Sequence, residues 1–414
     1  MTSLFVKYKS ATIDTLCLMA LQGLNYLLPL CVWPYLMVVL GVEQFGVIGF
    51  ASALMQFLII VVDYGFNITA TKAITLAQSK ADRTKIFYAT MAAKLVLLSM
   101  VAIIVYVVCS LPKFAIYRSA CYIMFGMVIG NVFTMQWLYQ GLKKIRVVTI
   151  VHAICRLLIL PLTFVVVKQP DHILLAATIL SVAYLAPAIV MIVITLHKRL
   201  VHRPVLSFGL VKTAFQEGFP VFVANGFSSV YAMLFVVFLG YFTAPDEVGK
   251  YAAVEKIIRG LCYLVLLPTI QAFYPYITKV AASSKQEALG VFCGIRNRVG
   301  VIMVLLGGVL FVTANIWPYL LGPEYEGTAT LFRIMAFIPL FVALGGVQGQ
   351  LGLLAIGHDK EKKCFRNVYI VAGILAVCGI LAISPILTAS NAAWVLFATE
   401  FLVAVGMVYY CRKL

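Results

Sequence analysis

The sequence predicts an all-α integral membrane protein with about 12 transmembrane helices, and two observations carry this prediction. First, 63% of the 414 residues are hydrophobic and only 11% are charged, whereas soluble proteins contain roughly 45 to 50% apolar residues. Second, the apolar residues form runs of about 20, which is the length of helix that crosses a hydrocarbon core of ~30 Å. Because lipid offers no partners for backbone N–H and C=O groups, we expect helices that satisfy these groups internally.

The hydrophobic runs divide the chain into predicted spans that are separated by short polar segments. The expected spans are approximately residues 13–33, 47–64, 86–111, 119–140, 147–167, 173–196, 219–242, 251–274, 299–317, 328–352, 368–387 and 392–411. Connections such as residues 34–44 and 384–391 are too short to form a domain outside the membrane. We therefore expect the function to reside within the bilayer.

Basic residues predict the orientation of these spans. If the N-terminus lies in the cytoplasm, 23 Lys and Arg residues fall in cytoplasmic segments, and only Lys113, Arg118, Lys168 and Lys250 fall on the opposite side. Loops on the cytoplasmic side of membrane proteins carry such an excess. Both termini are therefore predicted to be cytoplasmic. The same bias accounts for most of the formal charge of +17, so this charge does not indicate nucleic-acid binding.

The predicted spans fall into two groups of six, which we interpret as two lobes. The longest internal polar stretch, about residues 197–218, separates a lobe of residues 1–200 from one of residues 201–414. A faint repeat supports the division: Leu40, Gly41, Glu43, Phe45 and Gly46 are echoed by Leu239, Gly240, Glu247, Val248 and Gly249. Parallel repeats of this kind are related by an axis along the membrane normal, and we expect a cavity between them.

Two common kinds of site are not predicted. Most of the ten cysteines lie in or beside apolar runs, and no CxxC or Cys/His spacing occurs. We interpret them as small packing residues, without a disulfide framework or a metal site. No GxxxxGK[ST] loop for a nucleotide is present either. No cofactor is expected, and the energy source would be an ion gradient, the substrate gradient or a partner.

Charged residues inside the predicted spans are the strongest indication of function. A charge at mid-membrane costs at least about 2.5 to 3.5 kcal/mol, and five basic residues lie inside the spans: Lys94, Arg156, Lys256, Arg259 and Arg333. Only Glu255 and Glu400 are acids of similar depth. Since guanidinium groups suit phosphate oxygens, the positive excess predicts a central cationic cavity for a substrate that bears phosphate.

Part of this polar set is also explained by helix packing. Glu255 and Arg259 stand at i and i+4, so they can pair on one helix face. Gln22 and Asn25, three residues apart in the first span, suit hydrogen bonds to sugar hydroxyls, yet amides also hold helices together in lipid. Which of these roles applies depends on the rotation of each helix.

Several short segments form a recognisable set. Near the N-terminus they are Gln22–Tyr26, Leu27–Pro29, Pro34–Leu36, then Leu40, Gly41, Glu43, Phe45 and Gly46, and finally Asp63–Asn67 with Ala70 and Thr71. The second half adds Gly249, Tyr251, Glu255, Lys256 and Leu321–Glu324. With the layout of spans, these segments resemble O-antigen flippases of the Wzx type. Those proteins are in the polysaccharide transporter family of the multidrug/oligosaccharidyl-lipid/polysaccharide exporter superfamily.

The resemblance implies a multi-pass protein of the bacterial inner membrane that is not an enzyme. It would move undecaprenyl-diphosphate-linked O-antigen oligosaccharides from the cytoplasmic to the periplasmic leaflet by alternating access, coupled to an ion gradient. The expected partners are this lipid-linked substrate, membrane lipids, and the O-antigen polymerase with its chain-length machinery. The candidate substrate-binding residues are Lys94, Arg156, Lys256, Arg259, Arg333, Gln22 and Asn25, and the candidate ion-coupling residues are Asp63, Glu255 and Glu400.

Two other classes of protein remain as alternatives. A small-molecule exporter of the multidrug type would have the same layout, but cationic drugs favour an acidic lumen. A membrane-embedded polysaccharide polymerase would also handle lipid-linked sugars, but such an enzyme normally presents large external loops with catalytic basic residues. The basic excess and the short loops favour the flippase.

Overall fold

The computed structural model describes residues 2–201, 207–357 and 359–414, and every regular element in these ranges is a helix. Contacts between residues group the chain into two compact units. Unit 1 comprises the residues up to Val32 and Leu54–Gly226, and unit 2 comprises Trp33–Ala53 and Phe227–Leu414. The predicted lobe boundary near residue 200 adjoins residues 202–206, which lie outside the described ranges, and it stays a prediction.

Within the described residues, 10 helical stretches are long and apolar enough to cross a membrane. They are Cys31–Leu76, Lys80–Ser110, Pro112–Gly141, Ile145–Val166, Pro170–His197, Pro245–Ser283, Lys285–Val312, Thr328–Leu354, Lys360–Ala382 and Ala389–Cys411. The predicted all-α membrane fold is confirmed, whereas the number of twelve spans stays a prediction. Several helices extend beyond the predicted spans, because hydrophobicity marks only the part of a helix that lies in lipid. For example, α12 begins at Lys285, well before the predicted start at residue 299.

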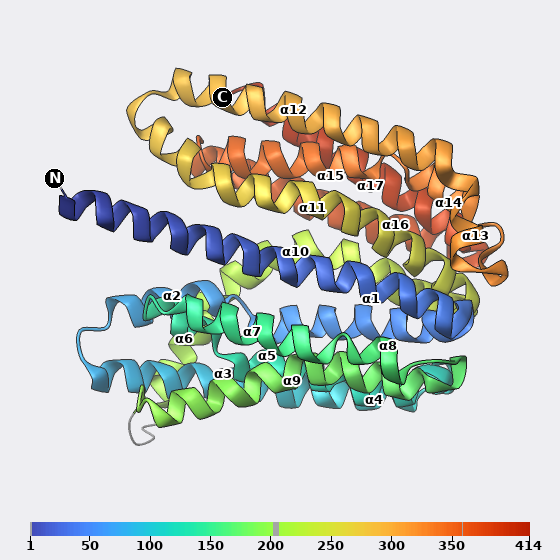
Figure 1. Ribbon diagram of the computed structural model, residues 1–414, viewed down its shortest axis with the longest axis horizontal. Helices are drawn as coiled ribbons and strands as arrows, with labels where there is room; N and C mark the ends of the chain where they lie inside the picture. The colour runs from blue at the N-terminus through green and yellow to red at the C-terminus, as the bar shows by residue number, and fades with distance from the viewer. Residues whose placement is uncertain (1, 202–206, 358) are drawn as a thin grey trace. The chain divides into compact units, whose positions relative to one another are not determined.

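Unit 1 is built mainly from the helices that follow the first long helix. From α1 (Thr2–Asp63) it takes the residues up to Val32 and from Leu54 onward, and from α10 (Phe208–Phe242) the residues up to Gly226. Its other elements are α2 (Phe66–Leu76), α3 (Lys80–Ser110), η1 (Pro112–Tyr117), α4 (Arg118–Met124), α5 (Gly126–Thr134), α6 (Gln136–Gly141), α7 (Ile145–Ile159), α8 (Leu162–Val166), η2 (Pro170–His172) and α9 (Ile173–His197). Helix α9 packs along α5, α4 and α7 (Figure 1). Between α6 and α9, Tyr139 and Thr195 share a buried hydrogen bond of 2.8 Å. This packing fixes the helices whose polar residues form the site described below.

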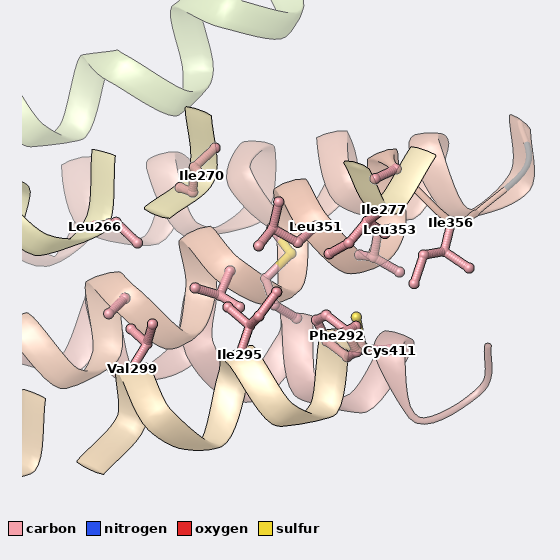
Figure 2. Packing of buried hydrophobic residues seen from close by; sticks show 14 of the residues in the cluster. Leu266, Ile270, Ile277, Phe292, Ile295, Val299, Leu351, Leu353, Ile356 and Cys411 are labelled. Carbon is pink, nitrogen blue, oxygen red and sulfur yellow. The ribbon is translucent and has the colours of Figure 1, made fainter. Parts of the chain in front are cut away.

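Unit 2 contains the rest of α10 and all later helices. They are α11 (Pro245–Ser283), α12 (Lys285–Val312), η3 (Thr313–Asn315), α13 (Trp317–Leu321), η4 (Pro323–Tyr325), α14 (Thr328–Met335), α15 (Ile338–Gly346), the π-helix Val347–Leu354, α16 (Asp359–Ala382), η6 (Ser384–Ile386) and α17 (Ala389–Cys411). Helices α11 and α12 form a long hairpin (Figure 1). Figure 2 shows the core between them, where Ile270 of α11 and Ile295 of α12 meet Leu351 of the π-helix.

A single residue, Gly41, separates the two helical parts of α1. Its backbone has φ 72° and ψ 173°, while the residues on both sides are helical. Glycine adopts a positive φ without the steric penalty of a side chain. The prediction of a loop over residues 34–44 is therefore wrong, since helix continues to both sides of one hinge residue.

Two residues of one distant segment satisfy the backbone groups that this hinge leaves open. The Glu324 carboxylate accepts a hydrogen bond from the Val42 N–H at 2.8 Å, and the Tyr325 hydroxyl donates to the Met37 carbonyl at 3.1 Å. Burial raises the pKa of the Tyr325 phenol, which keeps this donor protonated. Helix ends need such partners because their terminal N–H and C=O groups have none within the helix. Glu324 and Tyr325 thus hold both sides of the break within unit 2.

Replacing Glu324 with alanine is expected to destabilise the protein by about 1 to 3 kcal/mol, because the Val42 N–H loses a charged acceptor. Thermal unfolding of the purified protein in detergent measures the effect, and Glu326→Ala is the matched control, since Glu326 is an exposed acid two residues away. Equal midpoints for the two variants would show that the hinge does not depend on this hydrogen bond.

Candidate functional site

A break between α1 and α2 positions the first acid of the site, Asp63. Tyr64 and Gly65 follow it with φ of 43° and 84°, which ends one helix and starts the next. The Tyr64 ring stacks on Phe222 with centroids 4.9 Å apart. A positive φ at a bulky residue costs energy unless the surroundings hold it, and this aromatic contact helps to hold it. The break leaves Asp63 at a helix end within the membrane-spanning stretch Cys31–Leu76.

Asp63 forms an ion pair with Lys94 of α3. The Lys94 Nζ lies 2.8 Å from the Asp63 Oδ1, and the two side chains are only 2% and 23% exposed. A buried amine of this kind requires a partner, because an isolated charge in the membrane interior is costly. The sequence predicts Lys94 as a substrate contact and Asp63 as a coupling acid, and the structure brings the two together as one ion pair.

This ion pair borders a polar cavity of about 290 Å³ inside unit 1. The polar residues that line it are Asp63, Asn67, Lys94, Asn131, Thr134, Gln136, Thr149, His152, Arg156 and Tyr184. Arg156 of α7 lies with its guanidinium carbon 5.6 Å from the centroid of the Tyr184 ring, a cation–π distance. The two bases, Lys94 and Arg156, and the one acid, Asp63, leave the lining with a net positive charge. The cavity therefore suits an anionic group accompanied by hydroxyls.

A helix break and two unpartnered polar atoms distinguish the lining of this cavity. Met135 has φ 51° and breaks the helix between α5 and α6, next to the lining residues Thr134 and Gln136. Among the described residues, the Asn131 Oδ1 and the His152 Nε2 are buried without a hydrogen-bond partner. Buried polar atoms in proteins are nearly always satisfied by protein, water or ligand. Irregular helix of this kind at membrane depth is tolerated where it lines a cavity.

The remaining predicted acids form a second charged cluster, in unit 2. The Arg259 Nε donates to Glu255 one turn earlier on α11, and its Nη2 lies 3.3 Å from the Glu400 Oε1 of α17. The Tyr263 hydroxyl is 3.4 Å from the same guanidinium. Two carboxylates therefore share one guanidinium, and the i, i+4 pairing that the sequence predicts is present.

The other predicted residues lie in different surroundings. The Lys256 ammonium sits 3.9 Å from the centroid of the Trp33 ring. Arg333 is exposed and donates to the Asn315 Oδ1 at 3.0 Å. Gln22 and Asn25 fall in a stretch whose side chains are outside the described part of the chain. The substrate role of each of these four residues stays a prediction.

The charge count from the sequence needs one correction. It treats Glu255 and Glu400 as the only deep acids, whereas the structure adds Asp63 as the partner of Lys94. In unit 2, Glu255 and Glu400 balance Lys256 and Arg259, and the third base, Arg333, is exposed. The buried positive excess therefore belongs to the cavity of unit 1. The sequence alone assigns no role to Asn67 or Tyr184. Asn67 lies beyond the helix break at Tyr64 and Gly65, and Tyr184 lies on α9, so helical spacing from the predicted residues identifies neither.

Replacing Lys94 alone with alanine is expected to destabilise the protein by about 3 kcal/mol, the lower range for breaking a buried ion pair. The double variant Asp63→Asn with Lys94→Met removes both charges at similar volume and should regain most of this loss. Thermal unfolding of the two purified variants provides the comparison. If the double variant were no more stable than Lys94→Ala, the pair would not be the source of the loss.

Long apolar helices, broken helices within the membrane-spanning stretches and an internal polar cavity are typical of a multi-pass membrane transporter. Comparison with solved structures shows that transporters of known structure share this fold. An inward-facing multidrug resistance MATE family transporter of the MOP superfamily aligns with a TM-score of 0.75 and 12% identity over 94% of both chains. An outward-facing structure of such a transporter aligns with a TM-score of 0.57 and 15% identity, over 96% of this chain and 93% of the other.

Sequence comparison gives the family. The model described as "Polysaccharide biosynthesis protein" matches residues 12–281. A protein of Escherichia coli (strain K12) is 32% identical over 97% of this chain and 96% of its own, and one of Shigella dysenteriae is 25% identical over 87% and 90%. Both carry the name "Putative O-antigen transporter". The chain therefore belongs to the polysaccharide biosynthesis protein family, and the predicted resemblance is confirmed.

Proposed function

We propose that the protein translocates undecaprenyl-diphosphate-linked O-antigen oligosaccharides from the cytoplasmic to the periplasmic leaflet of the bacterial inner membrane by alternating access. The observation that carries the proposal is the composition of the unit 1 cavity, whose lining combines a net positive charge with amide and hydroxyl groups. The names of the two relatives, O-antigen transporters, support the same class of substrate.

The cavity chemistry matches the polar part of such a substrate. A diphosphate offers oxygens that an arginine can bind through two parallel N–H groups, and Arg156 supplies this group. Asn67, Asn131 and Gln136 supply amides that can bind sugar hydroxyls. The lipid tail remains in the bilayer, so only the head group requires a polar path. Lys94, which is paired with Asp63, adds to the positive electrostatic potential that a diphosphate would meet in the cavity.

Coupling to an ion gradient is the second part of the proposal. Arg259 bridges Glu255 and Glu400, and with Lys256 on the same helix the four groups are neutral as a set. Uptake of a proton by one carboxylate would give this set one positive charge. Binding such an ion changes the electrostatic energy of one conformation relative to another, which is how a gradient biases a transport cycle. Asp63 is the corresponding candidate in unit 1, where uptake of a proton would release Lys94.

One observation favours a second function. The fold is similar to that of multidrug resistance transporters, so export of small molecules is the alternative. The positive charge of the cavity disfavours organic cations and favours anions. A cell that overproduces the protein should gain no resistance to cationic drugs under this proposal.

Deletion of the gene in a bacterium that makes the cognate O-antigen tests the function. We expect loss of surface O-antigen and accumulation of lipid-linked units on the cytoplasmic side, with recovery when the intact gene is supplied. Normal surface polysaccharide in the deletion strain, without accumulated intermediate, would contradict the proposal.

A further inference from the structure

Two apolar grooves flank α15 on the surface of unit 2. The first has a volume of about 420 Å³ and lies between α12 and α15, where Gly300, Val301, Val304 and Leu305 face Leu340 and Leu344. The second has a volume of about 300 Å³ and lies between α15 and α17, where Phe341 and Leu344 face Phe401, Ala404, Val405 and Val408. Leu344 lines both grooves, so the short helix α15 separates two neighbouring apolar grooves.

Each groove ends at an arginine. Arg296 and Asn297 line the first groove, and the Arg296 guanidinium is held in place by two hydrogen bonds to the Asn297 Oδ1, from Nε at 3.1 Å and from Nη2 at 3.0 Å. Arg412 lines the end of the second groove beside Tyr409. Neither arginine has an acidic partner within ion-pair distance among the described residues. Each groove is thus lined mainly by apolar residues and has an arginine at one end.

The two arginines lie at the same end of unit 2. A Cβ atom on Gly352 of the π-helix would lie 2.4 Å from the Cys411 Sγ and 3.3 Å from the Phe292 Cζ, so these two side chains converge on one residue. Figure 2 shows Phe292 and Cys411 next to each other. Arg296 is one turn after Phe292, with its guanidinium carbon 5.9 Å from the Phe292 ring centroid, and Arg412 follows Cys411. The end of the first groove at Arg296 and the end of the second groove at Arg412 therefore lie on the same side of unit 2.

We infer that this surface binds an anionic phospholipid with two acyl chains, one in each groove on either side of α15, and with its phosphate at the end marked by Arg296 and Arg412. The arrangement matches the shape and charge of that lipid class: two apolar chains, one anionic head. A carrier lipid with a single isoprenoid chain would fill one groove and leave the other empty. The site is separate from the unit 1 cavity and does not depend on which substrate is transported.

Native mass spectrometry of the purified full-length protein, titrated with phosphatidylglycerol, tests the inference. We expect phosphatidylglycerol to bind at least about tenfold more tightly than phosphatidylcholine, the ratio that corresponds to roughly 1.4 kcal/mol. Replacing both Arg296 and Arg412 with glutamine should remove this preference. Arg298→Gln with Arg366→Gln is the control, because it removes the same charge from exposed arginines outside the grooves.

A second pair of variants tests the grooves themselves without changing charge. A Cβ atom at Gly300 or at Gly308 meets nothing within 4 Å, so leucine is sterically acceptable at both positions, but only Gly300 lines a groove. Gly300→Leu should weaken phosphatidylglycerol binding severalfold, and Gly308→Leu should not. Equal binding of the two phospholipids or unchanged binding after Gly300→Leu would each overturn the inference.

Discussion

The variant Arg156→Ala should transport lipid-linked oligosaccharide about 10- to 100-fold more slowly than the wild type. Hydrogen bonds to charged groups contribute about 1.5 to 3 kcal/mol each, and this factor corresponds to one such interaction with the diphosphate. Arg156→Lys should retain part of the activity, since it keeps the charge but loses the planar pair of donors. Transport is measured as restored surface O-antigen in a deletion strain that expresses each variant at matched levels.

Arg333 supplies the comparison for this experiment. The sequence predicts the same role for Arg333 as for Arg156, but the structure shows Arg333 exposed and hydrogen-bonded to Asn315. Arg333→Ala should therefore transport at close to the wild-type rate. A severe loss in Arg333→Ala with normal transport in Arg156→Ala would reverse our assignment and move the anion site out of unit 1.

The largest structural effect is expected from glycines in the crossing of α1 and α11 within unit 2. A Cβ atom on Gly46 would lie 1.9 Å from the Pro245 carbonyl oxygen, and one on Gly249 would lie 1.9 Å from the Val42 carbonyl oxygen. Neither backbone can move without separating the helices. Overpacking typically costs about 1 to 3 kcal/mol, and we expect the Gly249→Ala variant to lose at least about 3 kcal/mol, because the clash is with backbone.

The control for this prediction is Gly290→Ala on α12, where a Cβ atom meets nothing within 4 Å. Thermal unfolding in detergent should show a clearly lower midpoint for Gly249→Ala and a midpoint equal to or slightly above that of the wild type for Gly290→Ala. Similar midpoints for the two variants would mean that the helices do not cross as closely as the structure shows.

The sequence repeat acquires a physical meaning from this crossing. Gly46 and Gly249 are equivalent positions in the two repeated segments, and each segment places its glycine against the other's backbone. Small residues allow helices in lipid to approach closely. The repeat therefore marks where the two segments pack against each other, which a comparison of residues alone does not reveal.

Local features of the site could be predicted, and features that depend on helix packing could not. The pairing of Glu255 with Arg259 follows from a spacing of four residues on one helix. The pairing of Lys94 with Asp63 depends on the break at Tyr64 and on the rotation of α3, neither of which hydrophobicity determines. The same limit applies to Glu324, whose partner Val42 lies 282 residues earlier in the chain.

Flipping in reconstituted vesicles tests the central claim most directly. Purified protein is placed in vesicles that contain an undecaprenyl-diphosphate-linked oligosaccharide, and a membrane-impermeant enzyme modifies only the sugars on the outer leaflet. With an ion gradient imposed, wild-type protein should expose the inner-leaflet pool much faster than empty vesicles, and Arg156→Ala should approach the empty-vesicle rate. Wild-type protein that exposes no more than empty vesicles with an ion gradient of either direction would contradict the account.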